Sequence, residues 1–278
     1  MSAPAVRVGG PSAFGGDLRR MAYLSWIIGL TEYRLTYFGS VLGYLWSLVR
    51  PLMLFGIYYV VFSQIVDFGG DIANYPVLLL MNIVVFNFFI DSTSRAVTSV
   101  VDREAMVRKM QFPRLVIPLA RVMSSVLNLA ISLIAVFVFV LAYGLSPRLT
   151  WLLLPVTLVL IALFTLCVSM MLSALYVRFR DIAPIWGVLT TALFYGSPVL
   201  YAIDAVPQPY REWIVRLNPL APLLEQNRQW VIDAGAPGAA TAAGGAAWLL
   251  MPLAIGLAVS ALGVWVFNRE APLIAERL

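Results

Sequence analysis

The sequence predicts an all-α membrane protein with six transmembrane helices, and its composition is the first reason. Of its 278 residues, 61% are hydrophobic and 12% are charged, and the mean hydropathy is +0.88. Soluble domains carry about 25% charged residues, so an ordinary soluble domain is excluded. Six apolar stretches also reach the roughly 20 residues that a helix needs to cross a bilayer. They cover residues 47–66, 76–98, 115–143, 150–176, 182–203 and 247–267.

Basic residues predict how these spans are oriented. About 14 of the 19 lysines and arginines fall before span 1, between spans 2 and 3, between spans 4 and 5, or after span 6. The opposite loops hold only Arg148, Arg211, Arg216 and Arg228. Because cytoplasmic loops collect positive charge, we expect both termini to be cytoplasmic. The net charge of +5 has the same origin and indicates no nucleic-acid partner.

Two stretches outside the spans also have helical character. Tyr23 to Gly39 mixes aromatic, charged and hydroxyl side chains, which is typical of an amphipathic helix lying in the membrane interface. The alternative is a buried helix of a soluble extension. Residues 203–245 are too long and too apolar for a simple loop, so we expect two short re-entrant helices between spans 5 and 6. The chain then divides into a cytoplasmic N-terminal region with the interfacial helix (1–46), one six-span membrane domain (47–267) and a cytoplasmic tail (268–278).

The residue types that are missing exclude several kinds of enzyme. The chain has no histidine and one cysteine, so a Ser-His-Asp triad, a Cys-His pair and an ordinary zinc site cannot be assembled. A P-loop needs Gly-Lys-Ser/Thr, but the single lysine, Lys109, lies between Arg108 and Met110. We therefore expect no catalytic residue, no metal site and no cofactor in this chain. Any energy for work must come from elsewhere.

Aromatic side chains predict the wall of a conduit. One face of span 1 repeats rings at helical spacing, namely Phe55, Tyr58, Tyr59 and Phe62. Spans 2 and 5 add Phe86, Trp186, Phe194 and Tyr201. Such rings also pack against protein or lipid, which is the alternative. Buried tyrosines, however, need partners for their hydroxyl groups, and a sugar polymer offers both apolar ring faces and hydroxyls.

Span 2 carries a polar stripe through its inner half. It comprises Asn87, Asp91, Ser94, Arg95 and Thr98. Ionisable groups inside a span usually face a cavity or a partner, and Asp91 four residues before Arg95 is the favourable order for a helical pair. With the aromatic faces, this stripe would form a polar, ring-lined conduit; alternatively, the pair is solvated near the inner interface. Arg50, at the cytoplasmic start of span 1, would bind the phosphate of a lipid-linked substrate or anchor the helix to headgroups.

A short charged segment separates spans 2 and 3. The side chains in it that a soluble partner could contact are Asp102, Arg103, Arg108, Lys109, Phe112, Pro113 and Arg114. A basic turn between two spans gives such a partner a surface to push on, and proline stiffens its end. The alternative is an ordinary cytoplasmic loop that obeys the positive-inside rule.

A series of short motifs then carries a family resemblance. In order, they are Tyr33-Arg34-Leu35-Thr36-Tyr37-Phe38-Gly39-Ser40-Val41-Leu42-Gly43-Tyr44-Leu45-Trp46-Ser47-Leu48 with Pro51, Phe112-Pro113-Arg114 with Pro118, Arg178-Phe179-Arg180-Asp181-Ile182, Ser197-Pro198-Val199-Leu200-Tyr201, and Asn218-Pro219-Leu220. Together they resemble ABC-2 type permeases, above all those that export polysaccharides and teichoic acids. Asp102 departs from that pattern, which often has asparagine there.

The resemblance implies a homodimer of six-span subunits that works with two ATP-binding subunits, which hold ATP and Mg²⁺. It implies export of a lipid-linked polysaccharide, of O-antigen, cell-wall galactan or teichoic-acid type, across the bacterial cytoplasmic membrane. The segment 102–114 would couple to the ATPase, and a cytoplasmic gate would be formed by Arg178, Arg180 and Asp181. Asp181 would alternatively cap the helix of span 5.

Two other functions remain as alternatives. An ABC-2 exporter of a drug or a small lipid would share the coupling segment but would not need so many tyrosines and tryptophans. A membrane-embedded lipid-processing enzyme would use Asp91, Asp102 or arginines as acid, base and phosphate clamp. Against the enzyme, the carboxylates are scattered along the chain and no paired acid and base appears.

Overall fold

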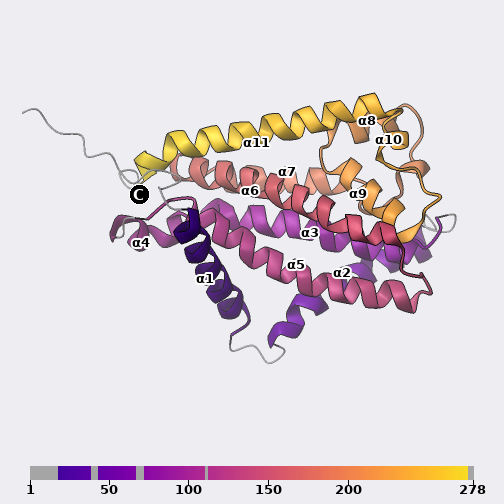
Figure 1. Cartoon of the computed structure of the whole chain (residues 1–278), viewed down its shortest axis with the longest axis horizontal. Helices are drawn as coiled ribbons and strands as arrows, with labels where there is room; N and C mark the ends of the chain where they lie inside the picture. Colours follow the sequence, from indigo (N-terminus) through magenta and orange to yellow (C-terminus); the bar gives the residue numbers. More distant parts are fainter. Residues whose placement is uncertain (1–17, 39–42, 67–71, 110–111, 275–278) are drawn as a thin grey trace, which may run out of the picture.

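The computed structural model describes residues 18–38, 43–66, 72–109 and 112–274. Across these residues the backbone forms helices joined by turns, without a strand, which confirms the predicted all-α class. The long helices lie side by side along the longest axis of the molecule (Figure 1). The fold is therefore a bundle in which each apolar helix packs against its neighbours.

Within the described residues, five helical segments are long and apolar enough to cross a membrane. Helix α2 (Trp46–Tyr59) continues into a π-helix (Val60–Ile65), and a 3-10 turn (Leu149–Leu153) leads into α6 (Leu154–Arg178). The other three are α3 (Tyr75–Thr98), α5 (Val116–Ala142) and α11 (Leu250–Glu270), which follows a 3-10 turn (Ala246–Leu249). Five of the six predicted spans therefore coincide with helices of spanning length.

The remaining predicted span, span 5 at residues 182–203, is shorter than expected. Helix α7 (Ile182–Tyr195) has 14 residues, or about 21 Å at 1.5 Å per residue. Beyond Tyr195 the chain turns, since Pro198 lacks an N–H and disfavours helix in the residue before it. Two side chains of α3 hold this turn: Asn82 Nδ2 donates to the carbonyl of Pro198 at 2.8 Å, and the Tyr75 hydroxyl donates to that of Leu200 at 2.8 Å. The predicted 22-residue span is thus a short helix and a turn that α3 holds in place.

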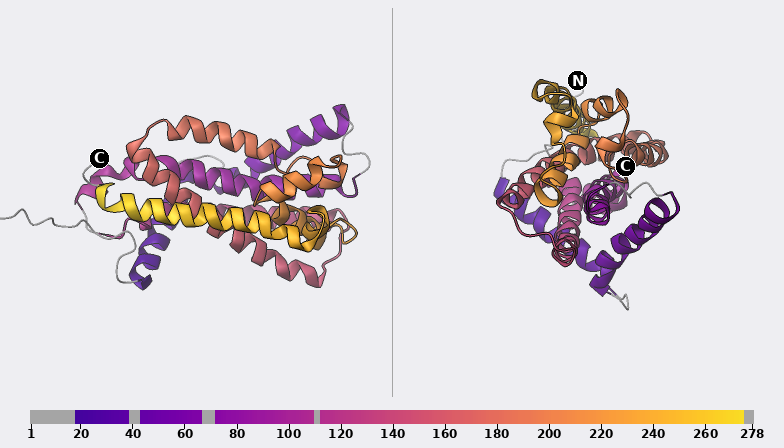
Figure 2. Two further views of the ribbon diagram at one scale, coloured as in Figure 1. Left: turned by 90° about the horizontal axis from the view of Figure 1, so that it is seen from above. Right: turned by 90° about the vertical axis from the view of Figure 1, so that its right-hand side faces the viewer.

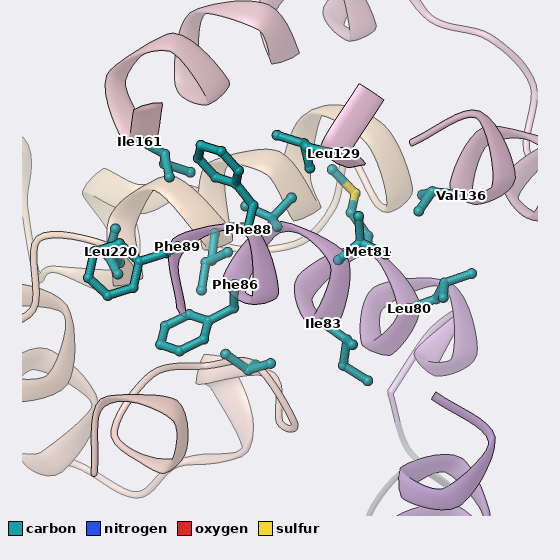
Figure 3. Close-up of a cluster of buried hydrophobic side chains, with 14 of the residues drawn as sticks. Leu80, Met81, Ile83, Phe86, Phe88, Phe89, Leu129, Val136, Ile161 and Leu220 are labelled. Atoms are coloured by element: carbon teal, nitrogen blue, oxygen red, sulfur yellow. The ribbon is translucent and has the colours of Figure 1, made fainter. Parts of the chain in front are cut away.

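Helix α3 forms the centre of the bundle. It packs against α2, α5, α6 and α7, and its first half is apolar on every side, as expected of a helix with protein all around it. Figure 3 shows Phe86, Phe88 and Phe89 projecting from α3 among side chains of neighbouring helices. By contrast, α2 buries none of its most apolar stretch within the subunit. The core therefore surrounds α3, and α2 flanks it (Figure 2).

Helix α1 (Leu18–Tyr37) crosses the bundle instead of running along it (Figures 1 and 2). Its buried face has a residue every four positions, Met21, Ser25, Gly29 and Tyr33, and packs on α5. Gly29 is required there because a Cβ would lie 2.9 Å from the Ala120 carbonyl oxygen. The helix exists where the sequence predicts one; its position in the membrane interface stays a prediction.

The two ends of the bundle differ. One end holds the short helices predicted between spans 5 and 6, namely α8 (Tyr210–Leu217), α9 (Ala221–Asn227) with a π-turn (Arg228–Ile232), and α10 (Ala239–Ala242). The opposite end holds α1, a 3-10 turn (Val101–Arg103), α4 (Glu104–Lys109), and the end of α11 with its 3-10 turn (Ala271–Leu273). We call these the α8 end and the α4 end. The described residues begin and end at the α4 end. The side of the membrane that this end faces stays a prediction.

Candidate functional site

A continuous series of aromatic rings runs along the bundle between α2, α3 and α7. Neighbouring ring centroids are 5.6–6.3 Å apart, within the usual range for aromatic pairs. In order from the α8 end, the members of this ring ladder are Phe62, Tyr58, Phe194, Phe86, Phe89 and Trp186. The Trp186 indole N–H donates to Thr93 Oγ1 at 3.1 Å, which fixes one end of the ladder to α3. Six residues from three helices thus form one aromatic strip.

The members of the ladder differ in exposure. Tyr58 and Phe62 are half-buried, whereas Phe86 is 1% exposed in the core. Phe86 therefore supports the more exposed rings from behind. The other two rings of the α2 stripe turn away: Phe55 stacks on Tyr59 at 5.8 Å and meets Phe139 of α5 at 5.5 Å. The stripe predicted as a single face thus contacts α7 on one side and α5 on the other.

The ladder ends in an aromatic cavity at the α8 end. This cavity measures about 200 Å³ and is lined by Phe62, Tyr195, Leu200 and Tyr201. The Tyr201 hydroxyl lies 3.4 Å from the Tyr195 carbonyl oxygen, so both tyrosines border the opening. Phe62 belongs to a π-helical turn, a feature frequent at functional sites. The cavity therefore offers an almost wholly apolar wall of ring faces and one leucine.

The polar stripe of α3 opens on a second cavity, nearer the α4 end. It measures about 110 Å³, and Asn87, Asp91 and Arg95 form part of its wall. Asp91 lies between two arginines, with its carboxylate 3.9 Å from Arg50 Nη1 and 3.8 Å from Arg95 Nη2. The predicted pair Asp91–Arg95 is therefore present, and Arg50 joins it. The Arg50 side chain is still 67% exposed, so its guanidinium remains accessible.

The two cavities lie on different sides of α3. The polar cavity is bounded by α2, α3 and α5 together with Tyr37 of α1, whose hydroxyl donates to Asn128 Oδ1 at 2.8 Å. The ring ladder instead runs between α2, α3 and α7. Within one subunit the aromatic faces and the polar stripe therefore do not share a wall, which differs from the expected polar, ring-lined conduit. Helical spacing in the sequence predicts the aromatic faces and the polar stripe separately. It does not predict how the two are oriented relative to each other in the folded subunit.

A cluster of charges, partly shielded from water except at Asp102, joins the coupling segment to the bundle. Glu32 of α1 forms ion pairs with Arg103 and with Arg121 Nη1, the latter at 3.3 Å from its Oε2. Arg121, from α5, also lies 3.7 Å from Asp102 Oδ2, which accepts a hydrogen bond from Thr98 Oγ1 at 2.8 Å. We call Glu32, Asp102, Arg103 and Arg121 the Glu32 cluster. Its two acids and two arginines balance in charge.

Several predicted contact residues of the coupling segment point into their own subunit. Arg114 is 3% exposed and its guanidinium lies 5.5 Å from the centroid of the Phe112 ring, which is itself buried. Arg103 is held by Glu32. Asp102 and Pro113 are more accessible, and the side chains of Arg108 and Lys109 lie outside the described part of the structure. Three of the seven predicted contact residues, Arg103, Phe112 and Arg114, thus support their own subunit.

The predicted gate residues lie in the turn between α6 and α7, at the α4 end. Arg178 Nη1 is 4.0 Å from Glu270 Oε1 of α11, and Arg180 stacks over the ring of Tyr176 at 4.9 Å. Asp181 occupies the N-cap position of α7 but makes no capping hydrogen bond with its side chain. All three side chains are exposed. The capping alternative is therefore not supported, and the turn is open to solvent or a partner.

A second buried charge cluster lies at the α8 end. Arg228 binds Asp204 with both guanidinium nitrogens, at 2.5 and 3.2 Å, and lies 3.5 Å from Glu225 Oε2. Glu225 also accepts the backbone N–H of Ile203 at 3.3 Å. Burial raises the pKa of Glu225 to about 7 because the carboxyl is only 1% exposed. We call Asp204, Glu225 and Arg228 the Glu225 cluster.

Comparison of the sequence with known proteins identifies the family of this chain. Residues 23–230 match the family model described as ABC-2 type transporter. The chain belongs to the ABC-2 type transporter family. This ABC-2 subunit is similar to two proteins named O-antigen export system permease protein RfbA. The one from Klebsiella pneumoniae is 33% identical over 199 residues (71% of this chain, 76% of the relative), and the one from Myxococcus xanthus is 29% identical over 194 residues (69% and 74%).

Membership settles the broad class of this ABC-2 subunit. The family consists of membrane subunits of transporters, so the chain is a multi-pass membrane protein and not itself an enzyme. The family motifs also gain structural roles. Asn218 Nδ2 donates to Ser197 Oγ at 2.7 Å, and its Oδ1 accepts the N–H of Leu220 at 3.0 Å. Two motifs that lie far apart in the sequence thus meet at the turn after α7.

Sequence reasoning missed several functional residues of this ABC-2 subunit. Glu32 and Arg121 sit in apparently ordinary stretches, an amphipathic helix and an apolar span, and only the fold brings them together. Glu225 lies in the stretch between spans 5 and 6, yet it is buried. One signal was available: a charged residue inside an apolar run, such as Arg121, needs a partner of opposite charge. The sequence could not say which acid that is.

Proposed function

We propose that this chain is the transmembrane permease subunit of an ATP-driven exporter that moves a lipid-linked polysaccharide across the bacterial cytoplasmic membrane. The observation that carries this proposal is the ring ladder ending in a tyrosine-lined cavity. Support comes from the ABC-2 family and from relatives named as O-antigen export permeases. Substrates of O-antigen, galactan or teichoic-acid type all present the sugar rings that such a wall would contact.

The ladder suits a polymer that must slide. Tight hydrogen bonds would hold each sugar unit, because leaving a buried polar group unpaired costs about 1–3 kcal/mol. Aromatic faces change their contact energy little as one sugar replaces the next. The tyrosine hydroxyls at the α8 end would offer hydrogen bonds where water is also available. We propose that the polymer passes along Tyr58, Phe62 and Tyr201 and leaves through the aromatic cavity.

The subunit works as a homodimer in this proposal. The exposed apolar surface of α2, with Leu52, Met53 and Ile57, and that of α7, with Ile185 and Val188, flank the ladder. A second copy facing these helices would supply each ring again and close a conduit between the two subunits. The polar cavities, which lie on another side of α3, would then open at the flank of the dimer.

Energy would come from two copies of a separate ATPase that binds ATP and Mg²⁺. The α4 end would face the cytoplasm, as the concentration of arginines there favours. The segment 102–114 would dock on the ATPase, and the exposed turn with Arg178, Arg180 and Asp181 would gate lipid entry. The accessible guanidinium of Arg50, beside Asp91 and Arg95, would bind the substrate phosphate as it enters from the membrane. Anchoring of α2 to headgroups is the competing role for Arg50.

Export of long polymers in cells tests this function. Replacing Tyr58 and Tyr201 with leucine keeps both sites apolar but removes two rings of the path. Trp265→Leu is the matched control, since Trp265 is an exposed ring on α11 away from the ladder. The surface polymer is quantified at matched permease levels, together with its chain-length distribution.

We expect the double tyrosine variant to reduce surface polymer several-fold and to affect long chains most, with Trp265→Leu near the parental level. Parental export by the double variant would show that these rings only pack. If deletion of the permease leaves surface polysaccharide intact and changes the export of a small lipid or drug, the polysaccharide assignment is wrong and the smaller cargo takes its place.

A further inference from the structure

Glu32 is the meeting point of three elements that are remote in sequence. It belongs to α1, and its carboxylate contacts Arg103 of the 3-10 turn before α4 and Arg121 of α5. The side chain of Glu32 is 10% exposed, so these contacts are shielded from water. Glu32 thus ties α1, the coupling segment and α5 together.

The cluster extends from Glu32 into α3. Arg121 also approaches Asp102, which Thr98 at the end of α3 holds by a hydrogen bond. Burial lowers the pKa of Arg103 to about 10, with a further contribution from the charge of Arg121, so Arg103 remains protonated at neutral pH. Each arginine of the cluster has an acid beside it, so the link between these elements is ionic.

A buried ion pair resists separation. Pulling one partner away leaves an uncompensated charge out of water, which costs about 3–5 kcal/mol. A force on the turn Val101–Arg103 therefore moves Glu32 as well, because the ion pair between Arg103 and Glu32 holds. Helix α1 carries that force further because its face with Ser25 and Gly29 packs closely on α5. In the sequence, the next long helix after α1 is α2, which holds Tyr58 and continues into the π-helix that holds Phe62.

We propose that Glu32 is a positioning residue of the transport cycle: it links the segment 102–114 to α1 and α5, so that movement imposed on that segment by the ATPase displaces α1 and, through it, α2. This inference rests on the proposed function. It assigns a role to α1 beyond lying in the membrane interface. The role depends on the ion pairs of Glu32 and not on contact between Glu32 and substrate.

The test uses the full permease reconstituted with its ATPase in lipid vesicles. The variants are Glu32→Gln and Arg121→Gln, and the matched control is Arg34→Gln, which removes a charge from the exposed side of the same helix. Three quantities are measured: the amount of ATPase that copurifies, the rate of ATP hydrolysis, and the polymer exported per ATP hydrolysed. The last quantity reports coupling and does not change merely because less protein folds.

We expect Glu32→Gln to keep the ATPase bound while export per ATP falls by about tenfold, the size of a coupling loss of 1.4 kcal/mol. Arg121→Gln should act in the same direction, and the double variant should be little worse than Glu32→Gln because both changes break one contact. Arg34→Gln should match the parent. Parental coupling in Glu32→Gln would overturn the proposal, as would losses in the two single variants that simply add.

A second variant covers the case in which Glu32→Gln folds poorly. Glu32→Leu with Arg103→Met replaces the ion pair by apolar side chains of similar size, a change that often leaves stability intact. We expect normal protein levels with export per ATP still low. Recovery of coupling along with stability would show that Glu32 is only structural. If the parent itself shows no ATP-dependent export, the proposed function fails, and that result is seen before any variant is compared.

Discussion

Two buried charge clusters close the two ends of this bundle, and they are built differently. The Glu32 cluster joins α1, the turn before α4 and α5, which are remote from one another in sequence. The Glu225 cluster joins the 3-10 turn Ile203–Ala205 to α9 and the π-turn after it, all within the loop region between α7 and α11. The first connects elements that could move against one another, whereas the second braces one local structure.

Their charge balance differs as well. The Glu32 cluster has two acids and two arginines, so every group has a partner of opposite charge. The Glu225 cluster has two acids and one arginine, and the nearby Arg211 instead donates to the carbonyls of Ile203 and Asp204 at 3.1 and 2.7 Å. Burial is the main reason why the pKa of Glu225 is raised, and the charge of Asp204 adds to it. The α8 end should therefore respond to pH through Glu225.

The largest expected effect is that of Arg228→Ala. It leaves Asp204 and the buried Glu225 without their shared arginine, which costs about 3–5 kcal/mol, or roughly 10 °C in the unfolding temperature. Arg211→Ala is the matched control, because that arginine of the same region donates only to backbone carbonyls. Thermal unfolding of the purified protein in detergent measures both. A parental unfolding temperature for Arg228→Ala would mean that the Glu225 cluster does not brace the α8 end.

A smaller effect is expected from pH. Burial raises the pKa of Glu225 from 4.5 to about 7. Between these values the folded protein keeps a proton that the unfolded chain releases, so stability rises as the pH falls from about 7 to 4.5 and is lost as the pH rises again. Asp204 does not contribute in this window: although burial opposes it, Arg228 holds the pKa of Asp204 below its ordinary value of 3.8.

Unfolding temperatures measured between pH 5 and about 8 test whether stability falls as the pH rises. We expect a fall of a few degrees across the range in the parent and a flat profile in Glu225→Gln, which cannot ionise. Glu32→Gln should keep the slope of the parent, because it leaves Glu225 unchanged. A slope that persists in Glu225→Gln would assign the titration to another group.

The two ends of the bundle and the helices between them also show what the sequence can predict. Apolar length predicts the bounds of α3, α5 and α11 closely, since hydrophobicity alone makes a spanning helix. It does not predict the end of α7, which depends on Asn82 and Tyr75 holding the following turn. Ring spacing identifies Tyr58 and Phe194, but the fold decides that they meet. Charge identifies the segment 102–114, but burial decides that Arg103 and Arg114 face inward. Pairings between distant residues are the part that one sequence leaves open.

The most direct test of the difference between the two ends is the number of polymer units exported per ATP hydrolysed. It compares Glu32→Gln with Glu225→Gln, one neutral and nearly isosteric change in each cluster, in vesicles that contain the ATPase. We predict that Glu32→Gln lowers this ratio by about tenfold while Glu225→Gln stays within about twofold of the parent. Equal ratios in the two variants, or a loss confined to Glu225→Gln, would contradict the view that the α4 end transmits movement and the α8 end braces the exit.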